Sequence, residues 1–201
     1  MPGGGIAALV PRGGSAALVS RGSRAALVSC AVAAWLVAAP AAAAPGDQLL
    51  DALQAAPNEQ SAAMIESRLR QAWIEGTSPA PRLLLGRAER ELSDNNPSGA
   101  ADWYDAALDL DPDCLPALRG RSQARLRLGD PAGALRDLQA ALQRQGRDFA
   151  ALQDLSRLAE ARQDWPAALS AWRLLLRTDP HTPGGLRRLR ELRRRSEGEA
   201  L

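Results

Sequence analysis

Few residues in this chain have side chains that could carry out catalysis. Its single histidine, His181, follows Asp179-Pro180, a context typical of a connecting loop. One histidine cannot form a His-based nucleophile system or a multi-histidine metal site. Cys114 is predicted to be a loop residue between helices, because no His–acid triad lies near it in the sequence. We therefore predict that the chain is not an enzyme and holds neither a cofactor nor a metal.

Carboxylates are plentiful, but their spacing is typical of a solvated surface. Asp102, Asp105 and Asp109 recur at intervals of three and four residues, which places them on one side of a helix. Such a charged stripe usually faces water, and a partner-binding role is the alternative. The search for function therefore turns to the helices that carry these side chains.

Residues 1–43 are predicted to be a disordered lead followed by a secretory signal peptide. Arg21 and Arg24 precede the apolar run 25–39, and small residues including Ala41 and Ala43 follow it. A basic flank, an apolar stretch and an A-x-A end are the features of such a signal. Cleavage after Ala43 would give a periplasmic or secreted protein.

Two other interpretations of this segment stay open. An uncleaved N-terminal anchor is disfavoured by length, because a membrane span needs about 20 apolar residues. Residues 27–30 resemble a lipoprotein cleavage box ending in Cys30, but the apolar run lies mostly after that cysteine. From Pro45 onward, 22 Arg stand against 23 acids, a net charge of −1. This charge does not favour a nucleic-acid partner.

Residues 81–182 repeat one pattern three times with a period of 34 residues, as 81–114, 115–148 and 149–182. In each copy, apolar spacings of three and four predict two amphipathic helices. Small residues recur where the paired helices must approach closely, at Ala88, Ser122, Ser156, Ala100, Ala134 and Ala168. The predicted N-caps of the second helices are Asn96, Asp130 and Asp164. A unit this short, repeated in tandem, predicts a solenoid.

These residues resemble the tetratricopeptide repeat. The pattern Ala-x₃-Tyr-x₂-Ala-x₄-Pro spans 100–112, and Leu128-Gly129-Asp130 leads into Ala134. Arg87 and Arg121 depart from it, since they stand at the seventh place, where the family usually has a large apolar residue. Gly146 likewise replaces a proline. The resemblance implies an all-α, right-handed helical solenoid of about four helix-turn-helix repeats plus a C-terminal capping helix.

The segments on either side of 81–182 match the pattern less well. Residues 47–80 show two helical apolar rhythms, with Asn58 as the predicted N-cap of the second, and we expect a divergent first helix pair or an N-terminal cap. Residues 183–201 are predicted to be a capping helix and tail. The run of arginines in this last helix also admits a patch for phosphate or anionic lipid.

The resemblance implies a concave groove lined mainly by the first helix of each pair. Transferred place by place, it predicts that the following residues face the groove: Arg82, Leu85, Gly86, Glu89, Leu92, Arg119, Gly120, Gln123, Leu126, Arg127, Gln153, Asp154, Arg157 and Glu160. The variant of the family that clamps a chaperone C-terminal carboxylate needs Asn at set places. Gly86, Gly120 and Gln123 do not supply these Asn residues, which argues against that ligand.

Together these features favour an exported, non-enzymatic adaptor or scaffold that binds a peptide or protein partner in its groove. Arg119, Arg127 and Arg157 favour an extended peptide bearing acids. The alternative is a membrane-associated accessory factor, held by an uncleaved N-terminal segment or by the Arg-rich last helix. Neighbouring copies differ in charge, with three Arg against eight acids in 81–114 and seven Arg against three acids in 115–148. The sequence leaves open whether this contrast joins the copies or polarises the groove.

Overall fold

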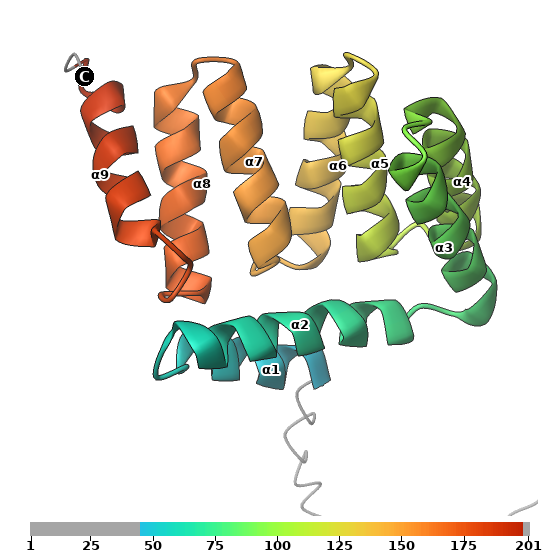
Figure 1. Ribbon diagram of the computed structural model, residues 1–201, viewed down its shortest axis with the longest axis horizontal. Coiled ribbons are helices and arrows are strands. Elements are labelled where there is room, and N and C mark those ends of the chain that lie inside the picture. The colour runs from blue at the N-terminus through green and yellow to red at the C-terminus, as the bar shows by residue number, and fades with distance from the viewer. Residues whose placement is uncertain (1–44, 199–201) are drawn as a thin grey trace, which may run out of the picture. The chain divides into compact units, whose positions relative to one another are not determined.

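The computed structural model describes residues 45–198, and the secondary structure in this range is helical (Figure 1). The predicted all-helical, helix-turn-helix fold is confirmed. The helices are α1 (Pro45–Gln54), α2 (Glu59–Glu75), α3 (Pro79–Ser93), α4 (Pro97–Leu110), α5 (Leu115–Arg127), α6 (Pro131–Arg144), α7 (Phe149–Ala161), α8 (Trp165–Thr178) and α9 (Gly185–Ser196). We call α3 to α9 the stack and α1 with α2 the hairpin. The predicted signal peptide lies outside the described residues.

The three turns inside the helix pairs of the stack share one construction. The predicted caps are confirmed, because the side chain of each cap accepts a hydrogen bond from the backbone N–H three residues later, at Asn96, Asp130 and Asp164. The residue before each cap is left-handed, with φ of 59° at Asn95, 78° at Gly129 and 58° at Gln163. A left-handed residue ends one helix so that the next can begin almost at once. Local sequence therefore fixes the antiparallel pairing of the helices.

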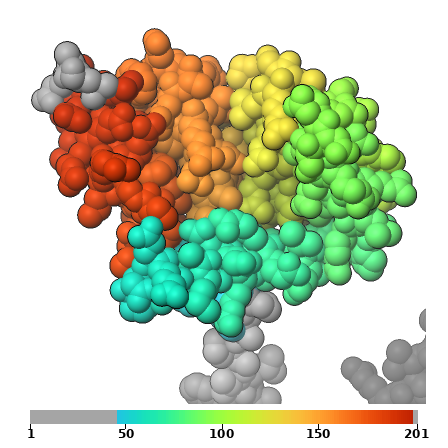
Figure 2. All heavy atoms as spheres, in the orientation of Figure 1, coloured from blue at the N-terminus to red at the C-terminus, as the bar shows by residue number. Residues whose placement is uncertain are grey.

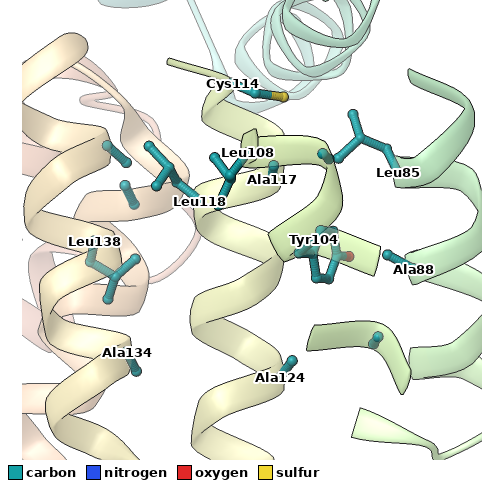
Figure 3. Packing of buried hydrophobic residues seen from close by; sticks show 14 of the residues in the cluster. Leu85, Ala88, Tyr104, Leu108, Cys114, Ala117, Leu118, Ala124, Ala134 and Leu138 are labelled. Carbon is teal, nitrogen blue, oxygen red and sulfur yellow. The ribbon is translucent and has the colours of Figure 1, made fainter. Parts of the chain in front are cut away.

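Small side chains allow the paired helices to pack closely. Ala88, Ser122 and Ser156 of the first helices are fully buried, and so are their counterparts Ala100, Ala134 and Ala168 in the second helices. Larger residues such as Tyr104, Leu118 and Leu138 fill the space between successive pairs (Figure 3). This alternation gives α3 to α7 one shared core, and a second cluster of buried residues joins α7, α8 and α9.

The two arginines that depart from the repeat pattern have specific partners. Arg121 forms a two-point ion pair with the buried Asp137, with N–O distances of 2.6 and 3.1 Å, and also contacts Asp105 at 2.6 Å. Arg125 donates to the same Asp137 at 2.8 Å. The guanidinium of Arg87 lies 4.9 Å from the centre of the Trp103 ring. Charge pairing and cation–π contact therefore replace apolar packing at the seventh place.

The hairpin is not stacked on α3 and α4 as a further repeat. It crosses one side of the stack, where α1 packs mainly against α8 and α2 against α5 (Figures 1 and 2). Leu50, Leu53 and Leu69 are completely buried in a cluster with residues of α7, α8 and α9. Burying each such leucine contributes about 1.5–3 kcal/mol, enough to hold the hairpin in place. Residues 47–80, expected to be a divergent first helix pair or an N-terminal cap, therefore form a helical hairpin across the stack, which in the described range has three pairs followed by α9.

Aromatic and charged contacts fix where the hairpin lies. Trp73 of α2 stacks on Phe149 of α7, with ring centres 5.7 Å apart and an interplanar angle of 28°. Arg147, in the loop before α7, reaches Asp51 of α1 at 2.5 Å. Each of these contacts occurs once and does not repeat every 34 residues. The repeat pattern of the sequence could therefore not indicate them.

The last helix, α9, packs on α8 and closes the core at that end. Leu192 is fully buried, and the indole N–H of Trp172 donates to the carbonyl of Gly185 at 2.9 Å. In the described range 45–198, no helix combines the length and the apolar character that a membrane span requires.

Candidate functional site: the concave groove

The main candidate site is a cavity of about 420 Å³ on the side of the stack formed by the first helices. We call it the groove. Its lining residues are Glu89, Leu92 and Ser93 of α3, Tyr104 of α4, Pro116, Arg119, Gly120, Gln123 and Arg127 of α5, Ala150 and Asp154 of α7, and Arg70 and Ile74 of α2. The lining residues of α3, α5 and α7 recur at intervals of three and four residues, so they lie on one face of each helix, and the three faces border the same cavity. The groove is thus built from three repeats and bounded by the hairpin.

Tyr104 forms part of the groove although it belongs to a second helix. Its ring passes between α5 and α3, opposite Ala88 (Figure 3). This route exists because position 120 is glycine, since a Cβ there would lie 2.1 Å from Cζ of Tyr104. Burial, together with the nearby Glu89, raises the pKa of the Tyr104 hydroxyl to about 12. The hydroxyl therefore stays protonated and can donate a hydrogen bond.

Arg119 lines the groove but is committed to the fold. Its Nη1 donates to Asp148 at 3.0 Å, and its guanidinium lies 4.8 Å from the centre of the Trp73 ring. Only 11% of its side chain is exposed. Asp148 in turn caps α7, where it accepts from the N–H groups of Ala150 and Ala151. Arg119 thus ties α5, α7 and the hairpin together, so it is a poor choice for testing recognition.

Arg127 is the groove arginine with the most free hydrogen-bonding capacity. Its Nη1 donates to the backbone carbonyl of Leu92 at 2.8 Å, and within residues 45–198 it has no carboxylate in an ion pair. A guanidinium has five N–H donors, so this bond holds the side chain over the groove and leaves other donors available. Arg127 is therefore the groove side chain best placed to bind an anionic group.

Gln123 and Asp154 face each other across the groove. The amide Nε2 of Gln123 donates to Asp154 at 3.5 Å, and Arg157 contacts the same carboxylate at 3.3 Å. Burial raises the pKa of Asp154 above its ordinary value, opposed by Gln123 and Arg157. The Gln123 contact is at the limit of hydrogen-bond length, so a ligand can replace it at little cost.

The structure divides the predicted site residues into several groups. Seven of them line the groove, namely Glu89, Leu92, Arg119, Gly120, Gln123, Arg127 and Asp154. Gln153, Arg157 and Glu160 instead line a separate hollow of about 260 Å³ beside α9. Arg82 donates to the carbonyl of Glu75, the last residue of α2, and to that of Thr77 in the loop before α3. Leu126 is exposed outside both cavities.

Leu85 corrects the place-by-place transfer from the family. It was expected to face the groove, but it is buried in the core beside Ala88 and Tyr104. The transfer also missed Arg70 and Ile74, which belong to α2. It missed Tyr104 as well, although that residue was identified as part of the repeat pattern. Gly120, which packs against Tyr104, is the sequence signal that could have indicated that the tyrosine ring reaches the groove.

The remaining side chains that could act as nucleophiles or metal ligands lie in places where they have a structural role or form part of a loop. Cys114 is buried at the start of α5, 3.7 Å from the hydroxyl of Thr77, and burial raises the pKa of its thiol. His181 lies in the loop before α9. In the part of the chain that the structure describes, no group of three or more His, Cys, Asp or Glu is arranged to hold a metal ion.

Helix pairs with shared turns, small residues at the crossing points and a groove on the side of the first helices define a tetratricopeptide-repeat fold, and comparison with known proteins confirms that resemblance. No protein-family model matches the chain. A TPR repeat-containing protein of Rhizobium etli is 24% identical over 130 residues, which are 65% of this chain and 64% of that protein. The chain thus spans less than two thirds of that relative's length.

Solved structures show the same fold at low sequence identity. The first TPR domain of human RPAP3 aligns with a TM-score of 0.54 and 19% identity, covering 59% of this chain and 93% of that one. The first TPR of Spaghetti (RPAP3), bound to the HSP90 peptide SRMEEVD, gives 0.55 and 20%, covering 58% and 95%. The complex of the TPR2AB domain of yeast Sti1 with pHSP90 gives 0.53 and 14%, covering 76% and 62%.

Proposed function

We propose that this chain is a non-enzymatic protein-interaction module that binds an extended peptide in the groove. The observation that carries this proposal is the cavity of about 420 Å³, lined by residues of three successive repeats. Two proteins of the same fold are bound to an HSP90 peptide or in a complex with pHSP90, which supports a peptide as the class of ligand.

The groove residues favour a peptide that carries acidic side chains. Arg127 offers unused donors, Gln123 offers an amide, and Tyr104 lines the cavity beside them. An ion-paired hydrogen bond to Arg127 would contribute about 1.5–3 kcal/mol. Gly86 and Gly120 do not supply the Asn side chains with which one variant of the family clamps a C-terminal carboxylate. We therefore propose an internal acidic segment as ligand in place of an HSP90-type C-terminus.

The proposal is tested with an array of immobilised ten-residue peptides of varied acidic content. We expect Arg127→Ala to weaken binding of the acidic peptides by about tenfold to a hundredfold, as expected for the loss of one charged hydrogen bond. Arg136→Ala is the matched control, because Arg136 is exposed on α6, in the same repeat and away from the groove. Equal binding by wild type and Arg127→Ala would contradict the proposal.

We further propose that the protein is exported and acts as an adaptor or scaffold in the periplasm or outside the cell. The basic flank, the apolar run 25–39 and the small residues ending at Ala43 support export. Cell fractionation with N-terminal sequencing tests it, and a soluble form beginning at Ala44 is expected. An unprocessed form in the membrane fraction would instead support the alternative, a membrane-associated accessory factor.

A further inference from the structure

Within residues 45–198, no helix covers the end of the stack formed by α3 and α4, because the hairpin lies across its side. At this end α3 and α4 present Leu83, which is 73% exposed, and Leu110, which is 59% exposed. Trp103 of α4 is only half-buried, and the guanidinium of Arg87 lies over its ring. Exposed large apolar side chains grouped at one end of a molecule commonly mark an interaction surface. We call these four residues, with Asp102 and Asp109, the first end.

The first end is also acidic. Residues 81–114 hold three Arg and eight acids, a net charge of −5. Asp102 and Asp109 are exposed along α4, and no ion pair within residues 45–198 neutralises either of them. A partner for this surface must therefore combine positive charge with some apolar area.

The opposite end of the stack has this complementary character. On α9, Leu186 is 66% exposed. Around it lie the exposed arginines Arg187, Arg190, Arg193 and Arg194, none of which takes part in an ion pair within the described range. The other two, Arg188 and Arg195, turn back to pair with Glu160 and Glu191. From Gly185 to Glu197, six Arg stand against two Glu, a net charge of +4. We call the outer face of α9 the last end.

We propose that the last end of one molecule binds the first end of a second copy of this chain. The charges of the two ends are opposite and each carries exposed leucine. In addition, α9 follows α8 as the first helix of a pair does, and no partner helix follows it within the described residues. The first end of another copy can occupy that open side. An anionic lipid surface would match the arginines of the last end, but it leaves the apolar, acidic first end unexplained.

The two ends differ, so the association is head-to-tail and can continue beyond a dimer. The contact area is limited to about one helix face on each side, which is typical of a weak and transient interface. Charge contributes much of the attraction, and the Debye length falls from about 30 Å at 0.01 M salt to about 3 Å at 1 M. Self-association should therefore rise with protein concentration and decline with added salt.

The test is sedimentation equilibrium. The sample is the protein purified from cells that express the full-length gene. The first-end variant carries Asp102→Arg and Asp109→Arg, and the last-end variant carries Arg190→Asp and Arg194→Asp. Each brings like charges together at the contact, so each variant alone should associate at least about a hundredfold more weakly than the wild type. A mixture of the two should associate again, because the two altered ends are opposite in charge to each other and the two intact ends are still complementary.

A matched control for the last-end variant carries Arg136→Asp and Arg162→Asp, which change the net charge by the same amount but lie away from both ends. It should associate like the wild type. A wild type that stays monomeric at all concentrations at about 0.01 M salt would overturn the proposal. So would association by either single-end variant, or failure of the mixture to associate. Binding of the wild type to phosphatidylglycerol vesicles without self-association would assign the last end to a membrane and also overturn it.

Discussion

Two glycines at the same place of successive repeats should respond in opposite ways to alanine. A Cβ at Gly86 of α3 would have no heavy atom within 4 Å, whereas one at Gly120 of α5 would lie 2.1–2.4 Å from three atoms of the Tyr104 ring. Alanine in place of glycine inside a helix contributes about 1 kcal/mol. Gly86→Ala should therefore raise the free energy of unfolding by about that amount.

At position 120 the same gain is opposed by overpacking. Forcing extra volume into a packed core costs about 1–3 kcal/mol, and the ring of Tyr104 cannot give way without leaving its buried position. The difference between the two variants isolates this steric cost, because the helix-propensity gain is common to both.

Urea unfolding followed by circular dichroism measures both variants in the same way. Adding Tyr104→Leu should relieve the clash, so that Gly120→Ala becomes stabilising in that background. If Gly86→Ala and Gly120→Ala stabilise the protein equally, the ring of Tyr104 does not pass beside α5, and the geometry of the groove described above is wrong.

Three further predictions concern the elements that hold the groove in shape. Gln163 is left-handed where the preceding repeat has Gly129, so Gln163→Gly should raise the unfolding free energy by about 0.5–1 kcal/mol in thermal or urea unfolding, and Gly129→Ala should lower it. Asp137→Ala should lower it by about 3 kcal/mol, because two arginines lose a buried carboxylate. Burial raises the pKa of Glu66, with a smaller contribution from the nearby Asp179 and against the opposing hydrogen bond from Arg70, so stability falls as pH rises from the ordinary carboxyl pKa to this raised pKa. Glu66→Gln should therefore stabilise the protein at neutral pH, and the gain should vanish in acid, where wild-type Glu66 is protonated.

The parts of the fold that the sequence predicts are those governed by local interactions. Asn96, Asp130 and Asp164 cap their helices through bonds to a backbone group three residues away, so a short window contains the whole interaction. The small residues at the helix crossings recur at a fixed period for the same reason. Both features could be identified without any tertiary information.

The parts that the sequence did not predict depend on contacts between distant segments. The stacking of Trp73 on Phe149 places the hairpin across the stack. Trp73 lies outside the three copies, and the other copies have Pro81 and Leu115 at the place of Phe149. Arg119 was expected to recognise a ligand, but its partner Asp148 lies 29 residues further along the chain. A list of groove positions indicates which way a side chain faces, but not whether its charge is already paired.

The most direct test of the central proposal is photocrosslinking in living cells that produce the protein. A benzoylphenylalanine placed at Gln123 would lie in the groove, and the same residue placed at Arg136 would lie outside it. We predict a covalent adduct from position 123 that mass spectrometry maps to an acidic segment of another protein and that is lost on Arg127→Ala. An adduct from position 136 with none from position 123 would show that partners bind elsewhere.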